Sequence, residues 1–270
     1  MKLPNTNHVS GLAEDWQRCR PERLPGAFFA YDDLERQSER VVTYRLDQEA
    51  MQYLHDTVPT KQGKPDFPPD FHFKIHLGLY KHLLTEDVPE RPAFTLFLQA
   101  LNNYPEKGHQ LSDKDYAGSV ELAWEKNSRF SETMATNTDS EANALSAAGA
   151  YLFVHSWMEL PEENLADPFT AVSKVLGKRV RAYRFAHEES KSIWHDIAAS
   201  LKGKNPALDV HLGNGLAVWA HPYSFRPVIE IKDVVNNGGE KLIERISGGA
   251  VNDSGDSFYD FGGPEPPPKQ

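Results

Sequence analysis

A short series of residues occurs twice in this chain at nearly the same spacing. Both copies contain His-Leu-Gly, then Arg-Pro, then Asn-Asn, at positions 76–78, 91–92 and 102–103 and again at 211–213, 226–227 and 236–237. The step from His to Arg is 15 residues in both copies, and the step from Arg to the first Asn is 11 in one and 10 in the other. A series repeated at matched spacing is typical of a duplicated structural unit. The sequence therefore predicts two similar units.

The two copies also share a hydrophobic pattern. Apolar residues alternate with polar ones around each tripeptide, at Phe73, Ile75, Leu77 and Leu79 and again at Leu208, Val210 and Leu212. Such alternation indicates strands with one buried face. Each copy is predicted to be a β-α-β-β unit. The expected strands are 41–46, 72–80 and 93–101 with a helix at 48–57, then 179–185, 207–219 and 226–232 with a helix at 187–201. A fourth strand is expected within 118–125.

We predict an α+β fold made by tandem duplication, with mostly antiparallel sheets because the connections between the last two strands of each copy are short. Thr138 and Glu141 have the spacing of a capping box and introduce one long apolar helix at about 140–158. The expected segments are a polar N-terminal stretch (1–27), the first copy (28–125), a linker with this helix (126–170), the second copy (171–258) and a flexible Pro-rich tail (259–270).

The composition is that of a globular protein, with 39% hydrophobic, 11% aromatic and 25% charged residues. The net charge of −10 argues against a nucleic-acid partner, which needs a basic footprint. Cys19 is the only cysteine, so an intramolecular disulfide is excluded. No stretch reaches the ~18 apolar residues of a membrane span, and the N-terminus lacks the pattern of a signal peptide. We therefore expect a cytoplasmic protein with no membrane partner.

The repeated histidines are the sharpest candidates for chemistry. If the copies pack about a pseudo-twofold axis, His76 and His211 meet near it, and with His72 and a carboxylate such as Glu230 or Asp209 they could bind Zn²⁺, Fe²⁺ or Mn²⁺. The alternative is that each histidine forms a structural hydrogen bond at a strand end. No other cofactor is predicted.

Two further pairs of residues are candidates for binding. Arg91 and Arg226 each precede a proline that holds them extended, so their guanidinium groups could bind a carboxylate or a phosphate. The alternative is a structural ion pair, for example with a glutamate of the repeat. His221 and Tyr223 lie in the predicted hairpin loop between the last two strands, and such loops often carry binding residues.

Three hypotheses for function follow. The sequence has no phosphate-binding loop, dinucleotide fingerprint, nucleophile elbow or H-E-x-x-H motif, so catalytic residues are unknown. The first hypothesis is therefore a protein-interaction module such as an adaptor, immunity-type or assembly factor, whose partner is another protein. The second is a metal-dependent enzyme or small-molecule binder with its site where the copies meet. The third is a self-associating structural subunit; the oligomeric state is left open.

Overall fold

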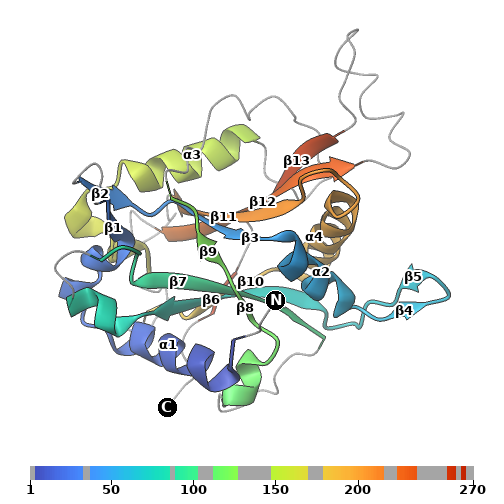
Figure 1. Cartoon of the computed structure of the whole chain (residues 1–270), viewed down its shortest axis with the longest axis horizontal. Helices are drawn as coiled ribbons and strands as arrows, with labels where there is room; N and C mark the ends of the chain where they lie inside the picture. Colours follow the sequence, from blue (N-terminus) through green and yellow to red (C-terminus); the bar gives the residue numbers. More distant parts are fainter. Residues whose placement is uncertain are drawn as a thin grey trace, which may run out of the picture.

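Two antiparallel five-stranded sheets form the centre of the molecule (Figure 1). The computed structural model describes residues 4–32, 37–85, 89–102, 112–126, 147–169, 179–215, 224–235, 254–259 and 263–265. The first sheet has the order β14-β10-β6-β7-β8, with strands Gly263–Glu265, Ala182–Arg184, His72–Leu79, Phe94–Leu101 and Val120–Glu121. The second has the order β13-β12-β11-β3-β9, with strands Ser254–Tyr259, Ser224–Val235, Ala207–Gly215, Thr43–Leu46 and Ala123–Trp124. The expected α+β class and antiparallel pairing are confirmed.

Helices cover the outer faces of both sheets and one end of the pair (Figure 1). The helix α1 (Thr6–Arg18) packs on β6, and α3 (Ala147–Met158) packs on β11. At the end, α2 (Gln48–Asp56) contacts α4 (His187–Ser200). No helix in the described ranges combines the length and the apolar character that crossing a membrane requires.

Short elements complete the described part of the chain. The 3-10 helices are η1 (Pro21–Arg23), η2 (Pro25–Phe28), η3 (Lys81–Thr85), η4 (Asp113–Tyr116), η6 (Glu162–Asn164) and η7 (Asp167–Phe169). Two small hairpins pair β1 (Phe29–Asp32) with β2 (Gln37–Arg40) and β4 (Thr60–Lys61) with β5 (Lys64–Pro65).

The hydrophobic core lies between the two sheets. The alternating residues predicted to be buried, such as Ile75 and Leu77 on β6 and Val210 on β11, are fully buried in it. The hydroxyl group of Tyr44 on β3 donates to the carbonyl oxygen of Phe94 on β7 at 2.6 Å. This bond joins the second sheet to the first and gives the buried hydroxyl group of Tyr44 its hydrogen-bond partner.

The two predicted units exchange their first strands. The strand β3 precedes β6 and β7 in sequence but pairs with β11, whereas β10 precedes β11 and β12 but pairs with β6. Each sheet therefore contains the hairpin of one unit and the first strand of the other. The sequence left open whether the two predicted units form one sheet, two packed sheets or two lobes; the first strand of each lies beside the hairpin of the other in two packed sheets.

Several local expectations need correction. The stretch 1–27 contains α1, whose Val9, Leu12, Ala13 and Trp16 are buried at helical spacing. The strand expected within 118–125 is two short strands, β8 and β9, which belong to different sheets. The tail 259–270 includes β14, whose Pro264 is tolerated because β14 is an edge strand. The apolar helix is described only from Ala147, and residues 140–146 lie outside the described part.

Candidate functional sites

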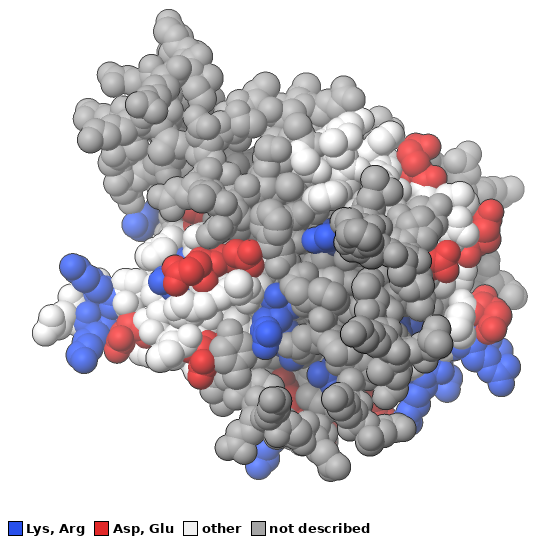
Figure 2. All heavy atoms as spheres, turned by 180° about the vertical axis from the view of Figure 1, so that it is seen from behind, with Lys and Arg blue, Asp and Glu red and all other residues white. Residues whose placement is uncertain are grey.

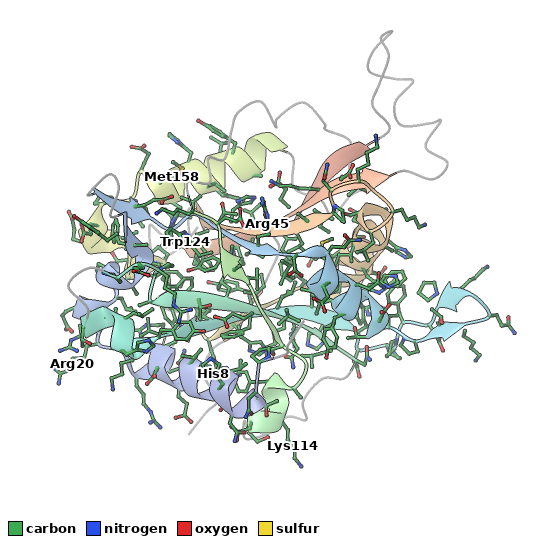
Figure 3. All side chains as sticks on the ribbon, in the orientation of Figure 1. His8, Arg20, Arg45, Lys114, Trp124 and Met158 are labelled. Atoms are coloured by element: carbon green, nitrogen blue, oxygen red, sulfur yellow. The ribbon has the colours of Figure 1, made fainter. Side chains whose placement is uncertain are left out.

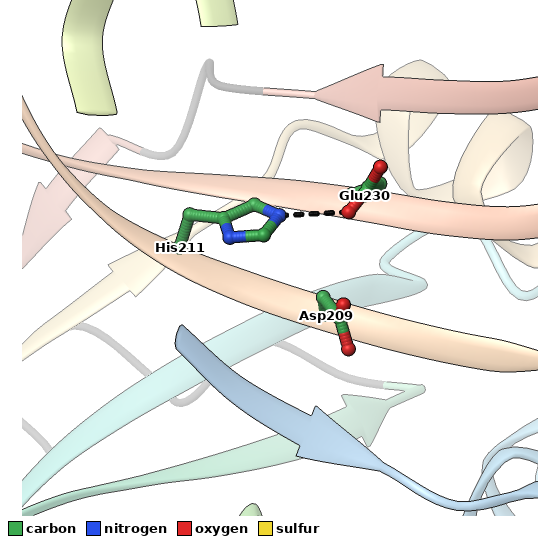
Figure 4. Close-up of side chains that lie close together, drawn as sticks. All are labelled: Asp209, His211 and Glu230. Carbon is green, nitrogen blue, oxygen red and sulfur yellow. Dashed lines mark hydrogen bonds and ion pairs between the residues drawn. The ribbon is translucent and has the colours of Figure 1, made fainter. Parts of the chain in front are cut away.

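A buried polar cluster lies on β11 and β12 (Figure 4). Asp209 and His211 are two residues apart on β11, and Glu230 on β12 is the cross-strand partner of Asp209, so all three share one face of the second sheet. Their exposed fractions are 1%, 3% and 0%. His211 Nε2 lies 2.9 Å from Glu230 Oε2, and His211 Nδ1 lies 2.9 Å from the hydroxyl oxygen of Thr43.

Two cationic side chains already balance the carboxylates of this cluster. Arg45 on β3 donates to both oxygens of Asp209, at 2.6 and 2.8 Å. Lys232 Nζ lies 2.8 Å from Asp209 and 3.4 Å from Glu230. Burial acts to raise the pKa of the Asp209 carboxyl group, but hydrogen bonding to Arg45 and the charge of Lys232 outweigh burial and hold that pKa below its ordinary value.

The donor set of the cluster is of a kind that binds divalent cations. One ligand atom from each of Asp209, His211 and Glu230 lies within 4.8 Å of the others. Glu230 Oε1 is buried and has no hydrogen-bond partner in the described structure. Imidazole and carboxylate together suit Zn²⁺, Fe²⁺ or Mn²⁺. In the arrangement seen here, however, a cation bound to Asp209 must first displace Lys232 or Arg45, since these occupy both carboxylate oxygens.

The structure does not bring the other predicted metal ligands to this cluster. His76 lies on β6 in the first sheet, where its Nε2 is 2.7 Å from Gln99 Oε1. His72 lies on the same strand, with Nδ1 2.8 Å from the carbonyl oxygen of Asp70. His76 and His211 face α1 and α3 respectively, on the outer sides of different sheets, as the contacts at the neighbouring glycines show. Of the predicted residues, His211 meets the carboxylates Glu230 and Asp209, and neither His76 nor His72 joins them.

The four predicted binding residues also lie apart. Arg91 precedes β7, and its guanidinium carbon is 4.2 Å from the centre of the Tyr80 ring. Arg226 lies inside β12, opposite Gly213. The position opposite the corresponding Gly78 is Thr95, so the two Arg-Pro pairs are not structural equivalents. His221 and Tyr223 lie outside the described residues.

The outward side of α3 is a second candidate site, which the sequence interpretation did not identify. This helix contains no charged residue. Ala150, Val154 and Trp157 are buried on its inner side, but Leu152 is 63% and Met158 is 43% exposed. His155 is exposed between them. Large apolar side chains on the outward side of a helix are normally covered. The signal in the sequence was the largely apolar composition of the helix, which only His155 and Ser156 interrupt from Ala150 to Met158.

Three glutamates lie where α3 ends. Glu159 follows the helix, and Glu162 and Glu163 begin η6; all three side chains are exposed. We call these three residues the acidic ridge. Figure 2 shows acidic atoms gathered along one edge of the molecule, with basic atoms below them. The outward side of α3 and the acidic ridge together form a surface with apolar and acidic parts.

No family model, curated protein or solved structure matches the chain.

Proposed function

We propose that this chain is a protein-interaction module that docks a partner segment on the outward side of α3 and the acidic ridge. The observation that carries this proposal is the exposure of Leu152 and Met158 on a helix without charges. Burial of apolar surface supplies most of the free energy of association, and exposed apolar side chains next to polar ones are typical of docking surfaces.

The charge of this surface selects the kind of partner. Glu159, Glu162 and Glu163 are exposed and form no ion pair within 4 Å with any described residue, although the charge of Arg40 acts on Glu159 and Glu162, so this surface keeps an acidic excess for a partner. The net charge of −10 adds a long-range attraction for a basic molecule. The partner we propose is therefore an amphipathic segment of another protein with leucine-like residues on one side and lysine or arginine beside them.

A model peptide tests this proposal. The probe is a fluorescein-labelled amphipathic helix of alternating leucine and lysine pairs, whose binding is followed by fluorescence anisotropy at low salt. Leu152→Asp is expected to weaken binding about tenfold, since Leu152 is the most exposed large apolar side chain of α3 and the change removes its contact area. Glu162→Lys with Glu163→Lys is expected to weaken binding and to reduce its salt dependence.

A matched control separates the surface from net charge. Asp66 and Asp70 are exposed at the opposite end of the molecule, so Asp66→Lys with Asp70→Lys makes the same change in charge and is expected to bind the peptide almost as wild type does. Equal weakening by both charge reversals would overturn the proposal. So would a wild-type dimer, seen by light scattering, that Leu152→Asp dissociates, because the occupant would then be a second copy of the chain.

We also propose that the molecule arose by duplication of a unit that includes the helices α1 and α3. Supporting it, the strand orders of the two sheets correspond when β9, β3, β11, β12 and β13 are matched to β14, β10, β6, β7 and β8. The ring of Phe28 stacks on that of Phe169 at 5.2 Å, and His55 stacks on Trp194 at 4.5 Å. Phe28 and Phe169 occupy matched positions in the two units, and so do His55 and Trp194. Matched residues touch each other when they lie beside a pseudo-twofold axis.

A metal-dependent activity at Asp209, His211 and Glu230 is the second candidate function. It is supported by the clustering of their ligand atoms and by the unbonded oxygen of Glu230. Metal analysis of the purified protein tests it: stoichiometric zinc, iron or manganese that His211→Ala removes and His76→Ala retains would favour this candidate over docking. For either function we propose a cytoplasmic setting, which suits the single free cysteine, Cys19.

A further inference from the structure

A basic pocket lies where α1 ends and η1 begins. It has a volume of about 360 Å³ and is lined by Asp15, Arg18, Cys19, Arg20, Arg23, Lys81 and Leu84. Figure 3 places Arg20 at the edge of the molecule beyond α1. The pocket belongs neither to the cluster on β11 and β12 nor to the outward side of α3.

The side chains that line the pocket have an excess of positive charge. Arg18, Arg20, Arg23 and Lys81 are exposed cations, and Asp15 is the one carboxylate among the lining residues. Arg18 pairs with Glu14 on the solvent side of α1, at 3.3 Å. The side chains of Arg20, Arg23 and Lys81 form no hydrogen bond or ion pair with a described residue. In a chain of net charge −10, this is a local concentration of unneutralised cations.

Arg179 contacts the backbone of Cys19, one of the residues that line the pocket. Its guanidinium group donates to the carbonyl oxygens of Trp16 and of Cys19, the latter at 2.8 Å, and lies 5.0 Å from the centre of the Trp16 ring. The last carbonyl groups of a helix carry partial negative charge that would repel an anion. Arg179 neutralises these groups, so the end of α1 does not oppose anion binding.

The matching end of α3 has the opposite charge. There Arg40 donates to the carbonyl oxygens of Trp157 and Met158, at 2.8 and 2.7 Å, as Arg179 does at α1. Beside Arg40, however, lie Glu159 and Glu162 of the acidic ridge. Arg40 and Arg179 thus bind the last carbonyl groups of α3 and α1 in the same structural way. Such contacts form at α3 without the basic side chains that line the pocket at α1. The basic lining is particular to the end of α1.

We propose that this pocket binds a compact polyphosphate group, either free or as the tail of a nucleotide. Three guanidinium groups offer paired N–H donors that match the oxygens of phosphate. Four cations and one carboxylate line the pocket, and Glu14 offsets Arg18, so about two positive charges remain to attract a polyphosphate. An acidic peptide spreads the same charge over several residues, and a pocket of about 360 Å³ holds only part of it.

The single cysteine reports on the pocket. Burial raises the pKa of the Cys19 thiol, although the charges of Arg179 and Arg23 oppose this effect. A bound triphosphate covers the thiol and offsets these positive charges, so it slows alkylation. With iodoacetamide, saturating sodium tripolyphosphate is expected to lower the alkylation rate of the wild-type chain about threefold or more at low salt. Because Cys19 is the only cysteine, mass spectrometry counts its modification without ambiguity.

Variants that replace cations by neutral glutamine, together with other anions, test whether the pocket binds polyphosphate. Arg20→Gln with Arg23→Gln is expected to raise the tripolyphosphate concentration for half-maximal protection of Cys19 about tenfold. Lys61→Gln with Lys64→Gln, on the exposed β4–β5 hairpin, is expected to leave that concentration unchanged. ATP that protects as well as tripolyphosphate would identify a nucleotide tail as sufficient, and protection by tripolyphosphate alone would identify the free anion. Absence of protection, equal protection by sulfate or by an octaglutamate peptide, or equal weakening in both variants would overturn the proposal.

Discussion

The indole N–H of Trp16 donates to the carbonyl oxygen of Val180 at 2.8 Å, although the two residues are 164 positions apart in the chain. Trp157 makes the same bond to Val41, also at 2.8 Å. Both bonds are buried, and each ties the helix on the outer face of one sheet to the residues just before a first strand. The attachment of α1 and α3 therefore depends on the exchange of β3 and β10.

Removing either indole N–H is expected to destabilise the fold. Trp157→Phe leaves the carbonyl oxygen of Val41 without its side-chain donor and is expected to lower the free energy of unfolding by about 1–3 kcal/mol. After Trp16→Phe the amide of Gln17 still donates to the carbonyl oxygen of Val180 at 3.3 Å, so the loss is expected near the lower end of this range. Urea unfolding monitored by circular dichroism measures both.

Trp124 provides the control for these variants. Its indole nitrogen is buried and has no hydrogen-bond partner among the described residues, so Trp124→Phe breaks no such bond. A loss at Trp124 as large as that at Trp16 would mean that ring size, and not the hydrogen bond, sets the cost.

Close packing of α3 on β11 requires Gly213. A β-carbon at this position would lie 2.5 Å from the carbonyl oxygen of Arg226 and 3.1 Å from the β-carbon of Phe153. Gly213→Ala is therefore expected to cost about 1–3 kcal/mol of stability. Gly11, in the exposed part of α1, has nothing within 4 Å, and Gly11→Ala is expected to stabilise by up to about 1 kcal/mol. Thermal unfolding of the two variants should shift in opposite directions; shifts of the same sign would contradict this packing.

The ion pair between the buried Asp209 and Arg45 makes the stability of the fold depend on pH. The pKa of Asp209 is lowered in the folded chain, so its contribution is complete above the unfolded pKa of about 3.9 and is lost as the pH falls through the folded value. Asp209→Asn is expected to destabilise by about 2 kcal/mol at pH 7 and to make the decline in stability below pH ~4 shallower. Chemical denaturation at a series of pH values measures this, with the exposed Asp66→Asn as control. If the free energy of unfolding fell with pH in the same way for the wild type and Asp209→Asn, the ion pair would be excluded as the source of the acid dependence.

Local features of the fold could be predicted from the sequence. The helix expected at 48–57 is α2, which Asp47 caps by accepting a hydrogen bond from the backbone of Ala50 at 2.8 Å. The strands β6 and β11 follow from alternation, which depends only on neighbouring residues. The exchange of β3 and β10 could not be predicted, because a short strand offers the same backbone groups to either hairpin.

The candidate sites could be predicted only in part, because they also depend on how the strands pair. His211 and Glu230 were identified, but Arg45 reaches Asp209 across the β3–β11 pairing, which local patterns do not reveal. A further repeat was overlooked: Trp, Pro-Glu, Leu and Phe recur in this order as Trp16, Pro21-Glu22, Leu24 and Phe28 and as Trp157, Pro161-Glu162, Leu165 and Phe169. This second series begins near the end of α1 and of α3 and supports the duplication proposed above. Exposure of Leu152 could not be read from the composition of α3, since an apolar helix is ordinarily buried.

Hydrogen exchange with and without the amphipathic leucine-lysine peptide tests the docking surface most directly. The account predicts that bound peptide slows exchange of backbone amides from Tyr151 to Met158 and at Glu162 and Glu163, while the exposed β4–β5 hairpin is unaffected. Saturating peptide that leaves α3 unprotected, or that protects only residues elsewhere, would contradict the claim that this helix receives the partner.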